Sequence, residues 1–242
     1  QMVFQDSYAS LNPRLTIETS IAFGPQVHGT PQREAIERAR DLLAKVGLEP
    51  SRFAGRYPHE LSGGQRQRIN IARALALRPR IVILDEAVSA LDKSVEAQVL
   101  NLLMDLKDEF RLTYVFISHD LHVVRYMSDR VMVMYLGKVA EIGPSEAIFD
   151  DPLHPYSAAL TRSMPTMDPD NRTDEAPLSG DPPNPIDPPS GCRFHTRCTF
   201  AEGVCSQRAP VLTRASALHD VACLRSEPGS GHTMAPDAAV AA

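Results

Sequence analysis

Residues 81–86 read Ile81-Val82-Ile83-Leu84-Asp85-Glu86, a continuous apolar run that ends in two carboxylates. Such a run is typical of a strand covered on both faces in a parallel sheet. A second run, Tyr114-Val115-Phe116-Ile117, follows a stretch from Val95 to Phe110 whose apolar residues recur at helical spacing. This alternation of strand and helix predicts an α/β fold with a parallel sheet.

The flanking segments extend this pattern. Residues 1–5 resemble the end of a strand, and residues 6–78 are mostly helical in pattern, with Thr30-Pro31 expected to cap and begin one helix. Residues 131–142 predict a hairpin around Gly137, which we expect to form an antiparallel edge of the sheet.

Composition and charge exclude several classes of protein. The chain has 242 residues, 43% hydrophobic and 23% charged, as in an ordinary globular protein rather than a disordered one. Its formal net charge of −5 argues against a nucleic-acid partner, because neutralising phosphates requires a basic surface. No apolar run approaches the roughly 20 residues that span a bilayer, so we expect any membrane link to go through a partner protein.

The C-terminal third changes in composition. Residues 165–191 hold eight prolines, at positions 165, 169, 177, 182, 183, 185, 188 and 189, and predict an extended linker. Residues 192–223 contain all four cysteines, and the Gly, Ser, Pro and Ala residues of 226–242 predict a disordered tail. Because the chain begins within a segment that resembles the end of a strand, we also expect the sequence to be a fragment without its N-terminal part.

Ser62 and Gln65 in the segment Leu61-Ser62-Gly63-Gly64-Gln65 have the spacing of a helix capping box. Gly63 and Gly64 leave the backbone N–H groups of the first turn uncovered, and the helix dipole adds positive potential there. The segment is therefore either an anion site or an ordinary capped helix.

Asp85 and Glu86 stand at the carboxyl end of a predicted parallel strand, where α/β proteins bind ligands. One such carboxylate can hold Mg²⁺ and a neighbour can polarise an attacking water, although two solvated loop acids would look the same. His119 follows the next strand at an equivalent position. The segment Ser89-Ala90-Leu91-Asp92 can be an N-cap turn for the helix after it.

The order of these segments is more specific than any one of them. It resembles the Q-loop, signature motif, Walker B, D-loop and H-loop of the ATP-binding cassette (ABC) ATPases. The matching residues are, in turn, Gln5, 61–65, Asp85-Glu86, 89–92 and His119. Over residues 1–150 the resemblance implies an α/β ABC-type nucleotide-binding domain, a parallel sheet with a helical subdomain. Residues 6–78 would form that subdomain, and residues 79–150 the Walker B and H-loop part.

The resemblance also implies roles. Asp85 would coordinate the Mg²⁺ of ATP through water, Glu86 would be the general base, and His119 would contact the γ-phosphate. Gln5 would sense Mg²⁺ or the attacking water and lie near the transporter groove.

The remaining roles concern a dimer. Ser62, Gly63, Gly64 and Gln65 would close over the ATP of a second ABC ATPase subunit, and Asp92 would line the same interface. The family's P-loop has no counterpart, since no G-x-x-x-x-G-K-[ST] occurs in the chain. We therefore expect an ATPase as the parent protein and no ATP binding by this chain alone.

Two further stretches resemble the ATPases of peptide and nickel importers, namely Ser10-Leu11-Asn12-Pro13-Arg14 and Pro152-Leu153-His154-Pro155-Tyr156. With the cysteine region they imply that family's C-terminal extension over residues 151–225. The implied function is ATP-driven uptake of peptides or related small solutes. The implied partners are two membrane permease subunits, a second ATPase and a substrate-binding protein, at the cytoplasmic face of a bacterial or archaeal inner membrane. The transported substrate is chosen by other subunits.

Cys192, Cys198, Cys205 and Cys223 lack the close C-x-x-C pairs of zinc ribbons. Four thiols in a reducing compartment still favour a metal site, either zinc or an iron–sulfur cluster, over four buried unligated thiols. The resemblance to peptide importers makes a [4Fe-4S] cluster the first choice. His195 and His219 are candidate ligands only if a cysteine is absent from the set.

Two alternative functions remain at this point. One is a non-transport ABC ATPase without a membrane partner, which co-purification with membrane subunits would distinguish. The other is a metal- or redox-sensing regulatory module in which the cysteine region carries the function.

Overall fold

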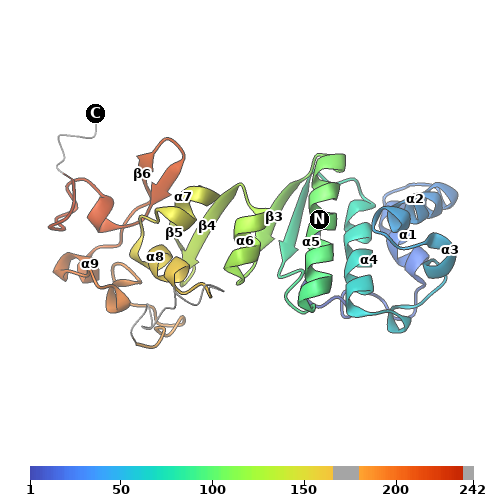
Figure 1. The fold of residues 1–242 in the computed structure, drawn as a ribbon, viewed down its shortest axis with the longest axis horizontal. Coiled ribbons are helices and arrows are strands. Elements are labelled where there is room, and N and C mark those ends of the chain that lie inside the picture. Colours follow the sequence, from blue (N-terminus) through green and yellow to red (C-terminus); the bar gives the residue numbers. More distant parts are fainter. Residues whose placement is uncertain (166–179, 237–242) are drawn as a thin grey trace. The chain divides into compact units, whose positions relative to one another are not determined.

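The computed structural model describes residues 1–165 and 180–236. It divides into two compact units, Gln1–Met127 and Ser128–Ala242 (Figure 1). Most of the predicted proline-rich linker, residues 166–179, lies outside the described residues. The units are described one at a time below.

The first unit contains a three-stranded parallel sheet. Its strands are β1 (Met2–Val3), β2 (Ile81–Asp85) and β3 (Thr113–Ile117), in the order β1-β2-β3. The register pairs Met2 with Ile83 and Asp85 with Ile117. The predicted α/β fold with a parallel sheet is confirmed.

The helices of this unit are α1 (Ile17–Val27), α2 (Gln32–Lys45), α3 (Pro50–Phe53), α4 (Gly63–Leu75), α5 (Lys93–Phe110) and α6 (Leu121–Met127). The expectation that Thr30 caps α2 is wrong, since Pro31 is the N-cap residue and no side chain caps the helix. Pro31 keeps the φ of −54° that its ring imposes, but its ψ of 142° is extended. The helix therefore begins one residue later.

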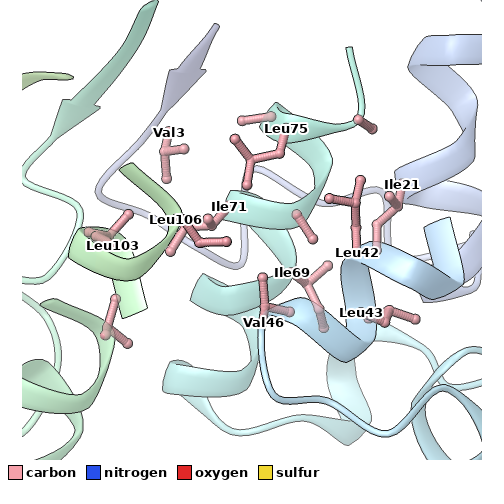
Figure 2. Close-up of a cluster of buried hydrophobic side chains, with 14 of the residues drawn as sticks. Val3, Ile21, Leu42, Leu43, Val46, Ile69, Ile71, Leu75, Leu103 and Leu106 are labelled. Atoms are coloured by element: carbon pink, nitrogen blue, oxygen red, sulfur yellow. The ribbon is translucent and has the colours of Figure 1, made fainter. Parts of the chain in front are cut away.

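One apolar core runs through the unit (Figure 2). Val3 of β1 packs with Leu103 and Leu106 of α5 and with residues of α4 such as Ile71, all of them at most 2% exposed. Helices α1 and α2 pack on the far side of α4 through buried aliphatic side chains, among them Ile21, Leu42, Leu43 and Ile69. Helix α4 therefore belongs to both halves of the core.

Within residues 1–165 and 180–236, one face of this sheet is covered and the other is open. Val82 and Leu84 are buried in the core, but Ile81 is 53% exposed and Val115 and Ile117 are each 47% exposed. The expectation that β2 is buried on both faces is therefore wrong for this part of the chain. Side chains alternate along a strand, so the helices that cover Val82 and Leu84 leave the opposite row uncovered.

The second unit contains a four-stranded antiparallel sheet in the order β4-β5-β7-β6. Its strands are β4 (Arg130–Tyr135), β5 (Lys138–Pro144), β6 (Thr213–Ser216) and β7 (His219–Val221). Its helices are α7 (Ser145–Asp150), α8 (Pro155–Arg162) and α9 (Gly203–Gln207). The hairpin around Gly137 is confirmed. It is not an edge of the parallel sheet, however, because β5 pairs with β7 of the cysteine region instead.

The chain after Ser226 is partly packed. Glu227, Ser230 and His232 are 5–6% exposed, and His232 Nε2 lies 2.9 Å from the carbonyl oxygen of Phe200. The predicted disordered tail is therefore wrong for this segment, since buried polar contacts outweigh its Gly- and Ser-rich composition. Residues 237–242 lie outside the described residues.

We expect Ile21→Ala to lower the free energy of unfolding by about 3 kcal/mol, because the truncation leaves a cavity in the α1–α4 core. Ile21 is 1% exposed, whereas Val27 of the same helix is 67% exposed. Val27→Ala is the matched control and should change stability by less than about 0.5 kcal/mol. Urea unfolding curves measure both, and equal losses would contradict the placement of this core.

Candidate functional site

The strand-end carboxylates lie at a sharp backbone turn. Asp85 is the last residue of β2, and Glu86 takes a φ of +46°, in the left-handed region that side chains other than glycine rarely adopt. The Glu86 backbone N–H donates to the carbonyl oxygen of Ile117, the last residue of β3, at 3.0 Å. The turn is thus fixed by the neighbouring strand.

Four side chains from three segments of the chain meet beside this turn. Gln5 Nε2 donates to Ser89 Oγ at 3.3 Å, and Ser89 Oγ donates to the Glu86 carbonyl oxygen at 2.9 Å. His119 Nδ1 lies 3.2 Å from Glu86 Oε1. The chain of contacts from Gln5 to His119 therefore passes through Glu86.

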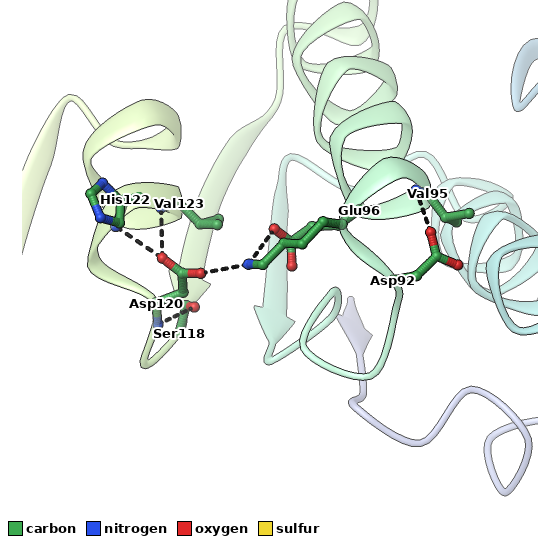
Figure 3. Close-up of polar contacts among 8 residues, drawn as sticks. Asp92, Val95, Glu96, Ser118, Asp120, His122 and Val123 are labelled. Carbon is green, nitrogen blue, oxygen red and sulfur yellow. Dashed lines mark hydrogen bonds and ion pairs between the residues drawn. The ribbon is translucent and has the colours of Figure 1, made fainter. Parts of the chain in front are cut away.

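Hydrogen bonds of Ser118 and Asp120, on either side of His119, hold the turn between β3 and α6 (Figure 3). Ser118 Oγ accepts a hydrogen bond from the Asp120 N–H at 3.0 Å. Asp120 Oδ1 accepts from the N–H groups of His122 and Val123, at 3.0 and 3.3 Å, and so caps α6. Asp120 Oδ2 lies 2.9 Å from the Lys93 ammonium group, and this hydrogen bond holds the pKa of Asp120 below its usual value.

The predicted capping box at the start of α4 is confirmed. Ser62 Oγ accepts from the Gln65 N–H at 3.3 Å, and Gln65 Oε1 accepts from the Ser62 N–H at 3.0 Å. Gly64 is buried against α5, where a Cβ atom would lie only 2.4 Å from Val95 Cγ1. A glycine at this position is therefore required by the close approach of α4 and α5.

Asp92 ends the segment 89–92 and is the N-cap residue of α5. Its side chain accepts from the Val95 N–H at 3.0 Å, which lowers the pKa of the carboxyl. A Cβ atom on Gly63 would meet Leu91 at 3.7 Å. The glycine turn of α4 and the segment before α5 are thus neighbours.

The loop after Gln5 is attached to α4. Asn70, which is 1% exposed, donates through Nδ2 to the Ser7 carbonyl oxygen at 3.0 Å. Arg73 donates to the Ser10 carbonyl oxygen, and the Arg66 guanidinium lies over the Tyr8 ring at 5.4 Å. Movement of α4 would therefore carry this loop with it.

The four cysteines of the second unit are free thiols around one small cavity. The Cys192 N–H donates to the Cys205 carbonyl oxygen at 2.8 Å. Gly191 allows this approach, because a Cβ atom there would lie 2.4 Å from the same oxygen and its φ is +64°. Burial raises the pKa of the Cys192 thiol to about 11 and also raises those of Cys198 and Cys223.

Three histidines, His154, His195 and His232, line the same cavity, whereas His219 does not. His219 Nε2 lies 2.6 Å from Oε1 of the fully buried Glu141. No set of three or more His, Cys, Asp or Glu side chains in residues 1–165 and 180–236 has the arrangement of ligands around a metal ion. In these described residues the four thiols therefore line one cavity without forming a recognisable group of metal ligands.

Glu141 also positions the segment 152–156. It accepts the N–H groups of Leu153 and His154, at 2.7 and 3.1 Å. His154 in turn caps α8, with Nδ1 accepting from the Tyr156 N–H at 3.0 Å. Burial, with the nearby Arg225 charge, lowers the pKa of His154 to about 4, so its ring is neutral at pH 7. The cap requires this neutral ring, because Nδ1 can accept a hydrogen bond only when it carries no proton.

Family models match both parts of the chain. The ABC transporter model matches residues 1–89, and the model of the oligopeptide/dipeptide transporter C-terminal region matches residues 140–205. The oligopeptide transport ATP-binding protein AppF of Bacillus subtilis is 53% identical over 226 residues, 92% of this chain and 68% of that protein. The chain belongs to the ABC transporter ATP-binding proteins of the oligopeptide/dipeptide branch.

A second relative supports the same branch, and a solved structure supports the ABC fold. The oligopeptide transport ATP-binding protein OppF of Escherichia coli is 50% identical over 236 residues, 94% of this chain and 69% of its own length. The solved structure of cbiO1 from Clostridium perfringens, part of the ABC transporter complex cbiONQ, matches with a TM-score of 0.57 at 29% identity. That match covers 62% of this chain and 59% of the other. The resemblance to ABC ATPases is thus confirmed.

The structure brings the predicted site residues of this ABC chain into two groups. Ser89 joins Gln5 to Glu86, His119 contacts Glu86 directly, and Asp85 precedes Glu86 at the end of β2. The capping-box residues and Asp92 form the second group, where α4 meets the start of α5. No helix in the described part of the chain has both the length and the apolar character that crossing a bilayer requires.

Sequence reasoning missed the bonding role of Ser89 and the contacts of Lys93, Asp120 and Glu141. Asp120 had a usable signal, since an aspartate directly before a helical apolar pattern is a common N-cap residue. The contact of Lys93 with Asp120 had none, because the two residues are 27 positions apart in the sequence.

We expect Gly64→Ala to lower the free energy of unfolding by about 2 kcal/mol, since the new methyl group overlaps Val95. Gly63→Ala is the matched control, because its Cβ would make only ordinary contacts. Val95→Ala in the Gly64→Ala background should restore most of the loss. Thermal or urea unfolding measures the cycle, and equal effects of the two glycine substitutions would contradict the close helix contact.

Proposed function

We propose that this chain provides the Walker B, signature and H-loop parts of an ATP-hydrolysing subunit that powers import of peptides or related small solutes. The observation that carries the proposal is the contact chain from Gln5 through Ser89 and Glu86 to His119 at the carboxyl ends of β2 and β3. Family membership supports it, because relatives matched over most of this chain are named oligopeptide transport ATP-binding proteins.

In this proposal each side chain at the strand ends has one task. Asp85 would hold the Mg²⁺ of ATP, and the ion would supply charge neutralisation at the phosphates. Glu86 accepts the proton of the attacking water, which its carboxylate can reach from the exposed side of the turn. His119 lies beside that carboxylate and contacts the γ-phosphate, while Gln5 reports on the water or the ion.

The second group of residues acts across a dimer. The N-terminal turn of α4, with Ser62, Gly63, Gly64 and Gln65, presents backbone N–H groups and the positive end of the helix dipole to the ATP of a second ATPase subunit. Asp92 lines the same interface. Each ATP is thus enclosed only when two subunits associate head to tail.

We further propose that two membrane permease subunits and a substrate-binding protein complete the importer, with this subunit at the cytoplasmic face of a bacterial or archaeal inner membrane. The segment on either side of Gln5 exposes Phe4 and Tyr8, each 47% exposed, as apolar surface for a membrane subunit. Asn70 and Arg73 attach the loop after Gln5 to α4, so movement of α4 on ATP binding would reach the docked subunit.

For the cysteine region we propose a [4Fe-4S] cluster as a resident cofactor. Its support is the donor set, since Cys192, Cys198, Cys205 and Cys223 line a single cavity. Four cysteine thiolates are the usual ligand set of a [4Fe-4S] cluster. The hydrogen bond from the Cys192 N–H to the Cys205 carbonyl oxygen, at 2.8 Å, holds the backbones of two of these cysteines together.

We expect Glu86→Gln in the full-length protein to retain ATP binding and to lose nearly all hydrolysis, because the amide cannot accept the proton of the attacking water. Phosphate release and nucleotide titration measure the two properties separately. Glu146→Gln, in the first turn of α7, is the control and should hydrolyse normally. An undiminished rate of ATP hydrolysis in Glu86→Gln would contradict the assignment of Glu86 as the general base.

We expect anaerobically purified protein to contain iron and acid-labile sulfide, with broad visible absorbance. Cys205→Ser should lose both, since it removes one of the four thiolates. Ser216→Ala, at an exposed position of β6, is the control and should retain them. Stoichiometric zinc in a colourless protein, or no metal at all, would overturn the cluster proposal.

A further inference from the structure

Lys93, the first residue of α5, contacts the carboxylates of Glu96 and Asp120, which Figure 3 labels. Its Nζ lies 3.0 Å from Oε1 of Glu96, one helical turn further along α5. The same atom lies 2.9 Å from Oδ2 of Asp120, in the turn between β3 and α6. The ammonium group thus joins the start of α5 to a turn that lies far away in the sequence.

The contact with Glu96 restricts the Lys93 side chain, so the Lys93–Asp120 ion pair is better ordered than an isolated pair on the surface. The Lys93 side chain is 77% exposed, and a lone pair between so exposed a lysine and a carboxylate contributes little. Glu96, however, is only 7% exposed, and a carboxylate withdrawn from water needs a cation or hydrogen-bond donors nearby. Glu96 therefore holds the ammonium group where Asp120 can also reach it.

Asp120 connects the Lys93 ammonium group to the turn that contains His119. Its second oxygen, Oδ1, accepts the N–H groups of His122 and Val123, so one carboxylate binds both Lys93 and the start of α6. Ser118 Oγ holds the Asp120 N–H from the other side. His119 lies inside this turn, and its Nδ1 is 3.2 Å from Glu86 Oε1.

We propose that Lys93 is a positioning residue for the ATPase reaction, holding the 118–120 turn against α5 so that His119 stays beside Glu86. The inference rests on the proposed function for the roles of His119 and Glu86. Because Lys93 directly follows Asp92, the same ion pair links the proposed dimer interface to the histidine. Displacement of the segment 89–92 when two subunits separate would therefore also displace His119.

The first test is made on this chain and does not depend on ATP hydrolysis. The hydrogen bond from Lys93 is the main cause of the lowered pKa of Asp120. Carboxyl ¹³C NMR titration should show that pKa rising toward its usual value in Lys93→Met and remaining low in Lys93→Arg. Lys45→Met is the matched control, because it removes a different ion pair, with Glu109, and should leave Asp120 unchanged. An unchanged titration in Lys93→Met would overturn the proposed contact.

The second test measures ATP hydrolysis by the full-length protein with its partners. Lys93→Met should lower kcat about 10-fold with KM for ATP unchanged, since misplaced catalytic groups slow the chemical step. Lys93→Arg should restore the rate and Lys45→Met should not affect it. Wild-type kcat in Lys93→Met, where Glu86→Gln is inactive, would overturn the inference alone. A fully active Glu86→Gln would instead show that the proposed function fails.

Discussion

The parallel pairing of β2 with β3 is the constraint on which the candidate site depends. The two strands stay in register to their last residues, Asp85 and Ile117, and the Glu86 N–H then bonds to the end of β3. Both chain segments therefore leave the sheet at the same edge, and Glu86 and His119 come within hydrogen-bond distance. The left-handed backbone at Glu86 costs about 1–3 kcal/mol, which such a bonded framework can sustain.

Helix α4 connects this strand edge to the rest of the first unit. Its buried face packs against α1 and α2 on one side and against the sheet and α5 on the other. Gly64 sets how closely α4 approaches α5, and Asn70 and Arg73 hold the loop that begins after Gln5. One helix thus carries the proposed contact to a second subunit and the proposed contact to the membrane partner.

The second unit is organised around a different buried group. Glu141 is fully buried and accepts hydrogen bonds from the start of the segment 152–156 and from His219 of β7. A buried carboxylate is tolerated only when its oxygens are satisfied, so these partners are fixed together. His154, positioned in this way, lines the cysteine cavity. The oligopeptide-type extension is therefore built onto the β4–β5 hairpin.

Local patterns in the sequence determined much of this protein. The apolar run of residues 81–84, the capping box of Ser62 and Gln65, and the order of motifs from Gln5 to His119 predict strands, helix starts and family without a structure. Each depends on neighbouring residues or on motif order, which a sequence shows directly.

Tertiary structure alone decided the contacts between distant residues. Three examples are the ion pair of Lys93 with Asp120, the fit of Gly64 against Val95 and the burial of Glu141. They join positions between 12 and 78 residues apart. The uncovered face of β2 and the packed segment after Ser226 likewise depend on what lies next to them in space. No local pattern encodes such neighbours, because burial and charge pairing arise only once the chain has folded.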